Sequence, residues 1–209
     1  MTRADVTIVD YGVGNLGSLR NALAKVGRTA DITGDPDAVA VAERIILPGV
    51  GAFDRAVGRL SETGLAEAIT AAAKAGTPLA GVCLGMQLLL DGSDEGALPG
   101  LGLIAGKATR FPATIDGHRL LVPHMGWSSA VAAKPSRLAP ALSDGGRFYF
   151  VHSYAVDADE ADDVLTWTDY GRRYASSVER DNVLGIQFHP EKSHRYGLAI
   201  LRDFAGSSH

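Results

Sequence analysis

The sequence of 209 residues is short of several features, and each shortage excludes a class of protein. It has one cysteine, Cys83, so no disulfide can form within the chain, and a cytoplasmic location is expected. No apolar run reaches the roughly 18 residues that a membrane span requires. The first residues show no charged leader followed by an apolar segment, so we expect no secretion signal. The formal net charge of −4 gives no reason to expect broad affinity for nucleic acids.

Motifs for common cofactors are also missing. The chain has no Walker phosphate loop and no cysteine and histidine spacing typical of a metal site. GVGNLG (12–17) fits the dinucleotide fingerprint G-x-G-x-x-G poorly, because the acidic residue that should follow it is absent. We therefore expect no cofactor and no metal.

Local patterns in the first 90 residues alternate between strand and helix, in the predicted order β-α-β-β-α-β-turn-α. Strands are predicted within 5–11, within 29–33 and within 43–53, where the strand runs into a Gly-Pro turn; helices within 15–27 and 52–75; and a strand, a turn and a helix within 77–90. The first helix is expected to end at Gly27 and the second to break near Gly64. This alternation predicts a mostly parallel sheet with helices on both faces.

The second half of the chain consists of short strand-like segments separated by turn residues, which fits an antiparallel or mixed extension of the same sheet. The segments are KATRF, RLLVPHMGW, RFYFVHSYAV, DVLTWTDY, RYASSVER and NVLGIQFH. A helix over 193–204 is predicted to close the chain, with Ser193 as its N-cap, and the final GSSH is given no role. With 46% hydrophobic residues and no repeat or linker, one domain over 1–209 is expected.

The stretch GVCLG (81–85) places Cys83 where a predicted strand meets a predicted helix, at an edge of the sheet where ligands bind in such folds. This is the form of a nucleophile elbow with cysteine in place of serine. Glycines two residues before and after the cysteine leave room for strand and helix to approach, and a helix N-terminus favours a thiolate. A buried structural cysteine is the common alternative. The elbow context favours an exposed nucleophile.

A thiol nucleophile needs a base, and the base needs a group that orients it. Of the six histidines, only His189 is followed two residues later by a carboxylate at a predicted strand end, in GIQFHPEKS (185–193). Side-chain alternation could place His189 and Glu191 on the same side. The triplet alone is a weak sign, because most such triplets are surface turns. His152, which alternates with aromatic residues, is interpreted as a histidine that is packed or that supports the site residues from behind, and His124 stays ambiguous.

PGVG (48–51) follows the predicted strand RIIL. Its two glycines allow positive φ and bring backbone N–H groups close to a ligand. Taken alone, this segment would be interpreted as a plain strand-to-helix turn. Beside a nucleophile it becomes a candidate oxyanion hole, formed by Gly49, Val50, Gly51 and the N–H of Leu84.

Together, these segments resemble the class I (triad) glutamine amidotransferases. GVCLGMQLL is similar to the nucleophile motif of that family, and QFHPEKS to its His–Glu motif. Further segments, from residue 8 to about 204, resemble one subfamily, the glutaminase subunits of imidazole glycerol phosphate synthases. They are IVDYGVGNLGSL, LPGVGAF, SDEGALPGLGLIAGKATRF, VPHMGW and YFVHSY. PHMGW, YFVHSY and the PGVG form, where relatives commonly have a Gly-Gly pair, point to this subfamily.

The resemblance implies a flavodoxin-like α/β fold and a Cys-His-Glu triad. Cys83 would attack the side-chain amide of glutamine, His189 would act as acid and then as base, and Glu191 would orient His189. The resemblance also implies four residues that hold glutamine or line its pocket: Gln87, Glu95, Ser153 and Tyr154. Without it, Gln87 and Glu95 would be interpreted as a solvated helix position and a solvated loop position.

In this subfamily the ammonia passes through a tunnel to a cyclase subunit, a (β/α)₈ barrel, in a step of histidine biosynthesis. The products are imidazole glycerol phosphate and an aminoimidazole carboxamide ribotide. No second site in this sequence could use ammonia, so a heterodimer with a cyclase is expected. The resemblance implies five partner contacts: Asn15, Met125, Trp127, Tyr149 and Lys192. Core packing is an equally good interpretation of Met125 and Trp127. Ser128 departs from the asparagine usual after PHMGW.

Three other functions stay open at this point. The same triad could serve a self-sufficient hydrolase of γ-glutamyl peptides. A non-catalytic or redox-sensing module could retain a reactive elbow cysteine, although the presence of Gln87, His189 and Glu191 argues against it. A sister glutaminase could feed another synthase, such as one for anthranilate or pyridoxal phosphate.

Overall fold

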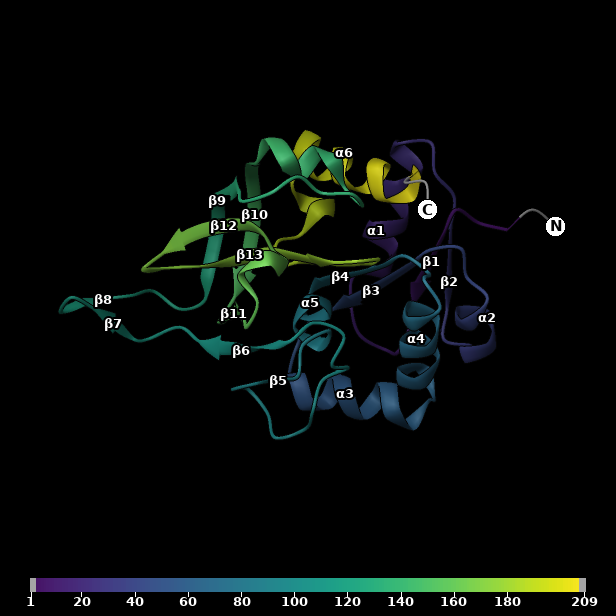
Figure 1. The fold of residues 1–209 in the computed structure, drawn as a ribbon, viewed down its shortest axis with the longest axis horizontal. Helices are drawn as coiled ribbons and strands as arrows, with labels where there is room; N and C mark the ends of the chain where they lie inside the picture. Colours follow the sequence, from purple (N-terminus) through teal and green to yellow (C-terminus); the bar gives the residue numbers. More distant parts are fainter. Residues whose placement is uncertain (1–2, 207–209) are drawn as a thin grey trace.

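The computed structural model describes residues 3–206, which form a large central sheet with helices on both faces (Figure 1). Residues 1–2 and 207–209, with His209 and most of the GSSH end, lie outside the described residues. The strands in chain order are β1 (Val6–Val9), β2 (Ala30–Thr33), β3 (Ile45–Gly49), β4 (Leu79–Cys83), β5 (Gly92–Ser93), β6 (Gly106–Arg110), β7 (Thr114–Ile115), β8 (His118–Arg119), β9 (His124–Ala132), β10 (Gly146–His152), β11 (Tyr154–Ala158), β12 (Val164–Tyr170), β13 (Arg172–Arg180) and β14 (Val183–Ile186). The helices are α1 (Leu16–Lys25), α2 (Pro36–Ala40), α3 (Phe53–Glu62), α4 (Leu65–Lys74), α5 (Leu84–Leu88) and α6 (His194–Gly206), with short 3-10 turns at Pro140–Asp144, Ala161–Asp163 and Pro190–Lys192.

The sheet has a parallel half and an antiparallel half, as the sequence predicts. Its order is β10-β9-β12-β13-β14-β4-β3-β1-β2. The strands β14, β4, β3, β1 and β2 pair in parallel, in the flavodoxin-like arrangement, and β13, β12, β9 and β10 extend the sheet with antiparallel pairing. Helices α1 and α6 cover one face of the parallel half, and α2 to α5 cover the other (Figure 1).

The centre of the sheet is buried on both faces. All five residues of β3 and all five of β4 are buried, which explains why each reads as an uninterrupted apolar run rather than an alternating one. The carboxyl ends of β3, β4 and β14 therefore meet at one edge of the sheet, deep inside the molecule.

One helix is missing from the predicted element order. Between the second and third strands the structure has α2, where Pro36 takes the first helical position and the Asp35 side chain accepts a hydrogen bond from the N–H of Asp37 at 3.0 Å. Because β2 and β3 both pair in parallel with β1, the chain between them must cross over a face of the sheet. Five residues are too few to give a clear helical pattern in the sequence.

Two predicted strands are interrupted. RFYFVHSYAV divides at Ser153 into β10, which pairs with β9, and β11, which pairs with β6 and β13. The chain must change partners there, and alternation of side chains does not show such a change. In RLLVPHMGW only the residues from His124 onward belong to β9.

The helix boundaries agree better with the sequence. Gly27 has φ 74° just past α1, and Gly64 has φ 73° between α3 and α4, so both predicted breaks are confirmed. Ser193 does precede α6, but its hydroxyl bonds elsewhere: it donates to the His189 carbonyl at 2.6 Å and accepts from the Tyr149 N–H at 3.0 Å. Within residues 3–206, no helix combines the length and apolarity needed to cross a membrane.

Candidate active site

Cys83 occupies a sharp turn between β4 and α5. Its backbone has φ 58° and ψ −111°, a sparsely populated conformation for a residue with a side chain. A Cβ atom at Gly85 would collide with the Leu47 carbonyl, and one at Gly81 would meet the Gly85 carbonyl at 2.5 Å. The predicted elbow geometry is therefore confirmed.

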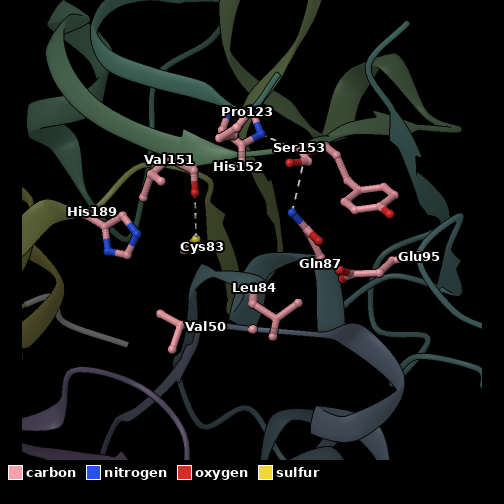
Figure 2. Close-up of a pocket in the computed structure, with 12 residues that line it drawn as sticks. Val50, Cys83, Leu84, Gln87, Glu95, Pro123, Val151, His152, Ser153 and His189 are labelled. Carbon is pink, nitrogen blue, oxygen red and sulfur yellow. Dashed lines mark hydrogen bonds between the residues drawn. The ribbon is translucent and has the colours of Figure 1, made fainter. Parts of the chain in front are cut away.

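The exposure predicted for this thiol is wrong. Cys83 is only 6% exposed, because β4 lies between β3 and β14 and the β10 strand passes over the sulfur. Its Sγ lies 3.9 Å from the Val151 carbonyl oxygen, as Figure 2 shows. Cys83 lines a pocket, through which a ligand can reach the sulfur.

His189 and Glu191 form a buried pair beside Cys83. The Nδ1 atom of His189 lies 2.8 Å from Oε1 of Glu191, and the two side chains are 5% and 3% exposed. Burial disfavours the imidazolium, but the interactions with Cys83 and with Glu191 outweigh it and raise the pKa of His189 to about 9. The other ring nitrogen, Nε2, is buried and makes no hydrogen bond with any described residue.

Backbone bonds hold this pair in place. The His189 N–H donates to the Tyr149 carbonyl of β10 at 2.9 Å, and the Ser193 hydroxyl donates to the His189 carbonyl. The turn that carries Glu191 is thus fixed from both sides, which is needed if the carboxylate is to hold one ring orientation.

A pocket of about 330 Å³ opens onto these groups, a volume at the lower end of the range for small-molecule sites. Cys83 and His189 line it (Figure 2). All four residues that the sequence predicts to hold glutamine or line its pocket also line it: Gln87, Glu95, Ser153 and Tyr154. Within residues 3–206, no cluster of three or more His, Cys, Asp or Glu side chains is placed to hold a metal ion.

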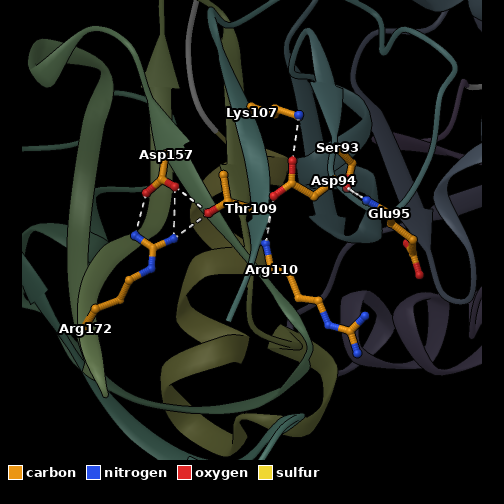
Figure 3. A network of polar contacts seen from close by, with 8 residues as sticks. All are labelled: Ser93, Asp94, Glu95, Lys107, Thr109, Arg110, Asp157 and Arg172. Atoms are coloured by element: carbon orange, nitrogen blue, oxygen red, sulfur yellow. Dashed lines mark hydrogen bonds and ion pairs between the residues drawn. The ribbon is translucent and has the colours of Figure 1, made fainter. Parts of the chain in front are cut away.

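Polar contacts fix the loop that carries Glu95 (Figure 3). Asp94 pairs with Lys107 at 2.6 Å and accepts from the Arg110 N–H at 3.3 Å, while the Glu95 N–H donates to Ser93. The Glu95 carboxylate accepts from the Phe53 N–H of α3 at 3.0 Å. Glu95 also lines the pocket, where its carboxylate lies beside Gln87 (Figure 2).

The same figure shows the strands behind that loop clamped together. Arg172 bonds both carboxylate oxygens of Asp157, at 2.6 and 2.9 Å, and the Thr109 hydroxyl at 2.7 Å. This contact ties β13 to β11 and β6, and β11 begins with Tyr154 at the pocket.

Three of the four candidate oxyanion residues line the pocket: Val50, Gly51 and Leu84. Gly51 has φ 96°. Gly49 does not have a positive φ; a Cβ there would lie 2.8 Å from the Tyr11 hydroxyl, so this glycine serves close packing. The Tyr11 hydroxyl donates to the Pro48 carbonyl at 2.7 Å, and burial and then the charge of Cys83 raise the pKa of Tyr11.

His124 and His152 do not pair with Glu191; they form a buried cluster with Tyr174. Each ring bonds the Tyr174 hydroxyl at 3.1 Å, and the two rings bond each other at 3.2 Å. Burial lowers the pKa of His124 to about 4 and that of His152 to about 3. His152 is packed, as one of the two interpretations has it, but it also lines the pocket; His124 is packed too. Ser128 bonds His124 at 2.8 Å, so this departure from the family pattern faces the cluster.

The residues predicted to contact a partner lie mostly at one surface. Met125 is 61% and Trp127 39% exposed, so the interpretation of these two as core residues is wrong. Trp127 meets Tyr149 edge-on at 6.2 Å, and Lys192 Nζ lies 5.7 Å above the Tyr149 ring. Asn15 is exposed immediately before α1.

Two further residues were not predicted: one joins the surface around Trp127, and the other lies beside Cys83. His194 stacks on Trp127 at 5.3 Å. Gln187, inside the QFHPEKS segment, lies fully buried against Cys83 and Gln87. Its position two residues before His189 was the available signal, since alternation places the two side chains on the same side of the chain.

Similar proteins of known name and similar solved structures agree with this fold and site. Relatives named "Imidazole glycerol phosphate synthase subunit HisH" occur in Symbiobacterium thermophilum (48% identical, covering 96% of this chain and 93% of the relative) and Salinibacter ruber (48%; 95% and 93%). A relative named "Imidazole glycerol phosphate synthase subunit HisH 2" occurs in Methanococcus maripaludis (42%; 95% and 98%). Among solved structures, PurLQS from Thermotoga maritima has a similar fold, with TM-score 0.73 at 20% identity over 97% of this chain and 98% of that one. A glutamine amidotransferase from the same organism has TM-score 0.64 at 17% identity, over 94% and 80%.

The match to a protein family covers nearly the whole chain. Residues 7–206 match the family "Glutamine amidotransferase class-I". With relatives above 40% identity along almost their full length and a shared fold, the chain belongs to the class I glutamine amidotransferase family.

Proposed function

We propose that this chain is the glutaminase subunit of an imidazole glycerol phosphate synthase. It hydrolyses L-glutamine to glutamate and ammonia and delivers the ammonia to a cyclase subunit in histidine biosynthesis. The observation that carries the proposal is the buried His189–Glu191 pair, which lies beside the elbow cysteine in one small pocket. The HisH relatives support the choice of synthase. A single amidotransferase domain over 1–209 and a cytoplasmic location are parts of the same proposal.

In the first half of the reaction, the Cys83 thiolate attacks the side-chain carbonyl carbon of glutamine. The negative charge that develops on the oxygen is held by backbone N–H groups among Gly49, Val50, Gly51 and Leu84. The imidazolium of His189 gives its Nε2 proton to the amide nitrogen, and ammonia leaves. The raised pKa of His189, about 9, keeps the proton available at neutral pH. A γ-glutamyl thioester on Cys83 remains.

In the second half, neutral His189 takes a proton from water, and the hydroxide formed attacks the thioester carbon. The carbon–sulfur bond breaks, the thiolate returns, and glutamate leaves. In both halves Nδ1 keeps its proton and donates a hydrogen bond to Glu191, with 2.8 Å between Nδ1 and Oε1. Nε2 is therefore the nitrogen that exchanges protons. The unpartnered, buried Nε2 fits that role.

The substrate lies along the far end of the pocket. The carboxylate of Glu95 and the amide of Gln87 bind its ammonium end, and Ser153 and Tyr154 contribute backbone contacts. Binding of the substrate by Glu95 depends on the loop that carries it, which the ion pair of Asp94 with Lys107 holds in position.

The cyclase partner, a (β/α)₈ barrel, binds at the surface carrying Asn15, Met125, Trp127, Tyr149 and Lys192, with His194 added from the structure. Exposed aromatic and methionine side chains gathered at this surface fit a protein–protein interface.

The test is glutamate production by the purified chain, alone and with the cyclase subunit of the same organism, with and without the cyclase ligand. We expect very slow hydrolysis alone and strong stimulation in the complex. C83A should abolish hydrolysis and still elute with the cyclase. A rate unchanged by the cyclase would count against the proposal. Turnover of γ-glutamyl peptides by the isolated chain would favour the self-sufficient hydrolase instead.

A further inference from the structure

Gln187 lies beside the nucleophile although it is far from it in sequence. It follows β14, whose Ile186 is paired with Val82 of β4, so the next residues of the two strands, Gln187 and Cys83, lie side by side. Its side chain is fully buried, and its N–H bonds the Ser176 carbonyl of β13 at 2.9 Å. A buried amide is unfavourable unless both of its ends have partners.

Both ends of the Gln187 side chain contact residues of the site. Its Nε2 donates toward the Cys83 sulfur at 3.9 Å, and its Oε1 accepts from Nε2 of Gln87 at 3.1 Å. This one amide therefore spans from the attacking atom to a residue that faces the substrate.

The contact fixes which way the Gln87 amide faces. Its nitrogen is engaged by Gln187 at 3.1 Å and by the Tyr154 carbonyl at 3.4 Å. In Figure 2 the Gln87 amide oxygen accordingly lies on the side of Glu95. Two acceptors side by side suit a donor-rich cation, such as the ammonium of free glutamine.

We propose that Gln187 is a positioning residue with two separate actions. Its side-chain oxygen orients Gln87 for the ammonium end of the substrate, and its side-chain Nε2–H group stabilises the Cys83 thiolate. The first action rests on the proposed function. The second concerns the resting enzyme, because the contact to sulfur needs no substrate.

Two variants separate the actions. Gln187→Glu keeps an oxygen for Gln87 but replaces the donor near sulfur with a second oxygen. Gln187→Met keeps the length and removes both. The readouts are kcat and KM for glutamine in the complex with the cyclase, and the pH dependence of Cys83 alkylation by iodoacetamide.

For Gln187→Glu we expect KM within about threefold of the parent, because the acceptor for Gln87 is kept. Its kcat should fall, and the midpoint of Cys83 alkylation should move to higher pH, because the carboxylate opposes the thiolate. For Gln187→Met we expect KM to rise about tenfold, as one lost hydrogen bond permits. Its alkylation midpoint should move by less than that of the glutamate variant.

Equal KM changes in the two variants, or an alkylation midpoint that stays where it is in Gln187→Glu, would overturn the proposal. If the methionine variant does not fold, the glutamate variant still tests the contact to sulfur. Because alkylation requires no turnover, a failure of the glutaminase assignment would show in the parent enzyme and leave the alkylation result interpretable.

Discussion

At the scale of single residues, the proposed mechanism depends on the charge of Glu191 next to His189. Glu191→Gln can still accept a hydrogen bond from Nδ1 but no longer stabilises the imidazolium. We expect the pKa of His189 to fall from about 9 by about one unit or more. Because the proposed mechanism requires a proton on His189 to release ammonia, the alkaline limb of the kcat/KM profile for the complex should move toward neutral pH by the same amount.

The matched control is Glu67→Gln, which removes the same charge from an exposed position in the first turn of α4. It should leave the alkaline limb in place. If Glu191→Gln keeps the limb of the parent enzyme, the carboxylate is not what sustains the proton on His189.

At the scale of elements, the turn between β4 and α5 depends on a close approach that only glycine permits. Gly85→Ala would drive a Cβ into the Leu47 carbonyl of β3, and backbone cannot give way as a flexible side chain can. We expect the free energy of unfolding to fall by about 3 kcal/mol, with loss of Cys83 alkylation in the folded fraction. Urea unfolding followed by circular dichroism measures the first effect.

Gly58→Ala is the control for that change. Gly58 lies inside α3, and a Cβ there would meet nothing within 4 Å. Alanine should raise the free energy of unfolding by about 0.5–1 kcal/mol, since it favours the helix. Similar losses in both variants would mean that the elbow tolerates a side chain.

At the scale of the whole molecule, the buried histidines make folding sensitive to acid. His124 and His152 have pKa values of about 4 and about 3 in the folded protein, below the 6.5 of an exposed histidine. The unfolded chain therefore binds protons that the folded chain does not. This contribution is fully present above pH 6.5 and is lost as the pH falls toward 4, at about 1.4 kcal/mol per pH unit for each histidine.

Replacing one of these histidines tests the cause. His152→Gln should make the free energy of unfolding fall less steeply between pH 6.5 and 5, by about 1.4 kcal/mol per unit. His118→Gln, at an exposed position of β8, should leave the slope of the parent protein. Parallel curves for all three proteins would place the acid sensitivity elsewhere.

The proposed partner surface is also a property of the whole molecule, since it gathers residues from β9, β10 and the start of α6. Trp127 lies at its centre, between Tyr149 and His194. Trp127→Ala should weaken binding to the cyclase about 30-fold, which is typical of a central aromatic contact. Val41→Ala, an exposed residue after α2 at the opposite edge of the sheet, should bind as the parent does. Titration calorimetry with the cyclase would show the difference.

The amino-acid sequence by itself determined the features that depend on neighbours along the chain. The order of the longer strands and helices, the elbow at Cys83 and the spacing of His189 and Glu191 follow from periodicity, glycine placement and side-chain alternation. The open α/β fold follows from the same patterns, because alternating strands and helices leave few ways to bury their apolar faces.

Tertiary structure alone decided the features that depend on distant segments. Three such features arise where β4, β10 and β14 converge: the burial of Cys83, the break between strands at Ser153, and the hydrogen bond from Gln87 to Gln187, which is 100 residues away in sequence. The raised pKa of His189 has the same origin, since the interactions with Cys83 and Glu191 that outweigh the effect of burial act on its ring only after folding. Local sequence cannot show these effects, because they result from packing between segments that no short-range pattern connects.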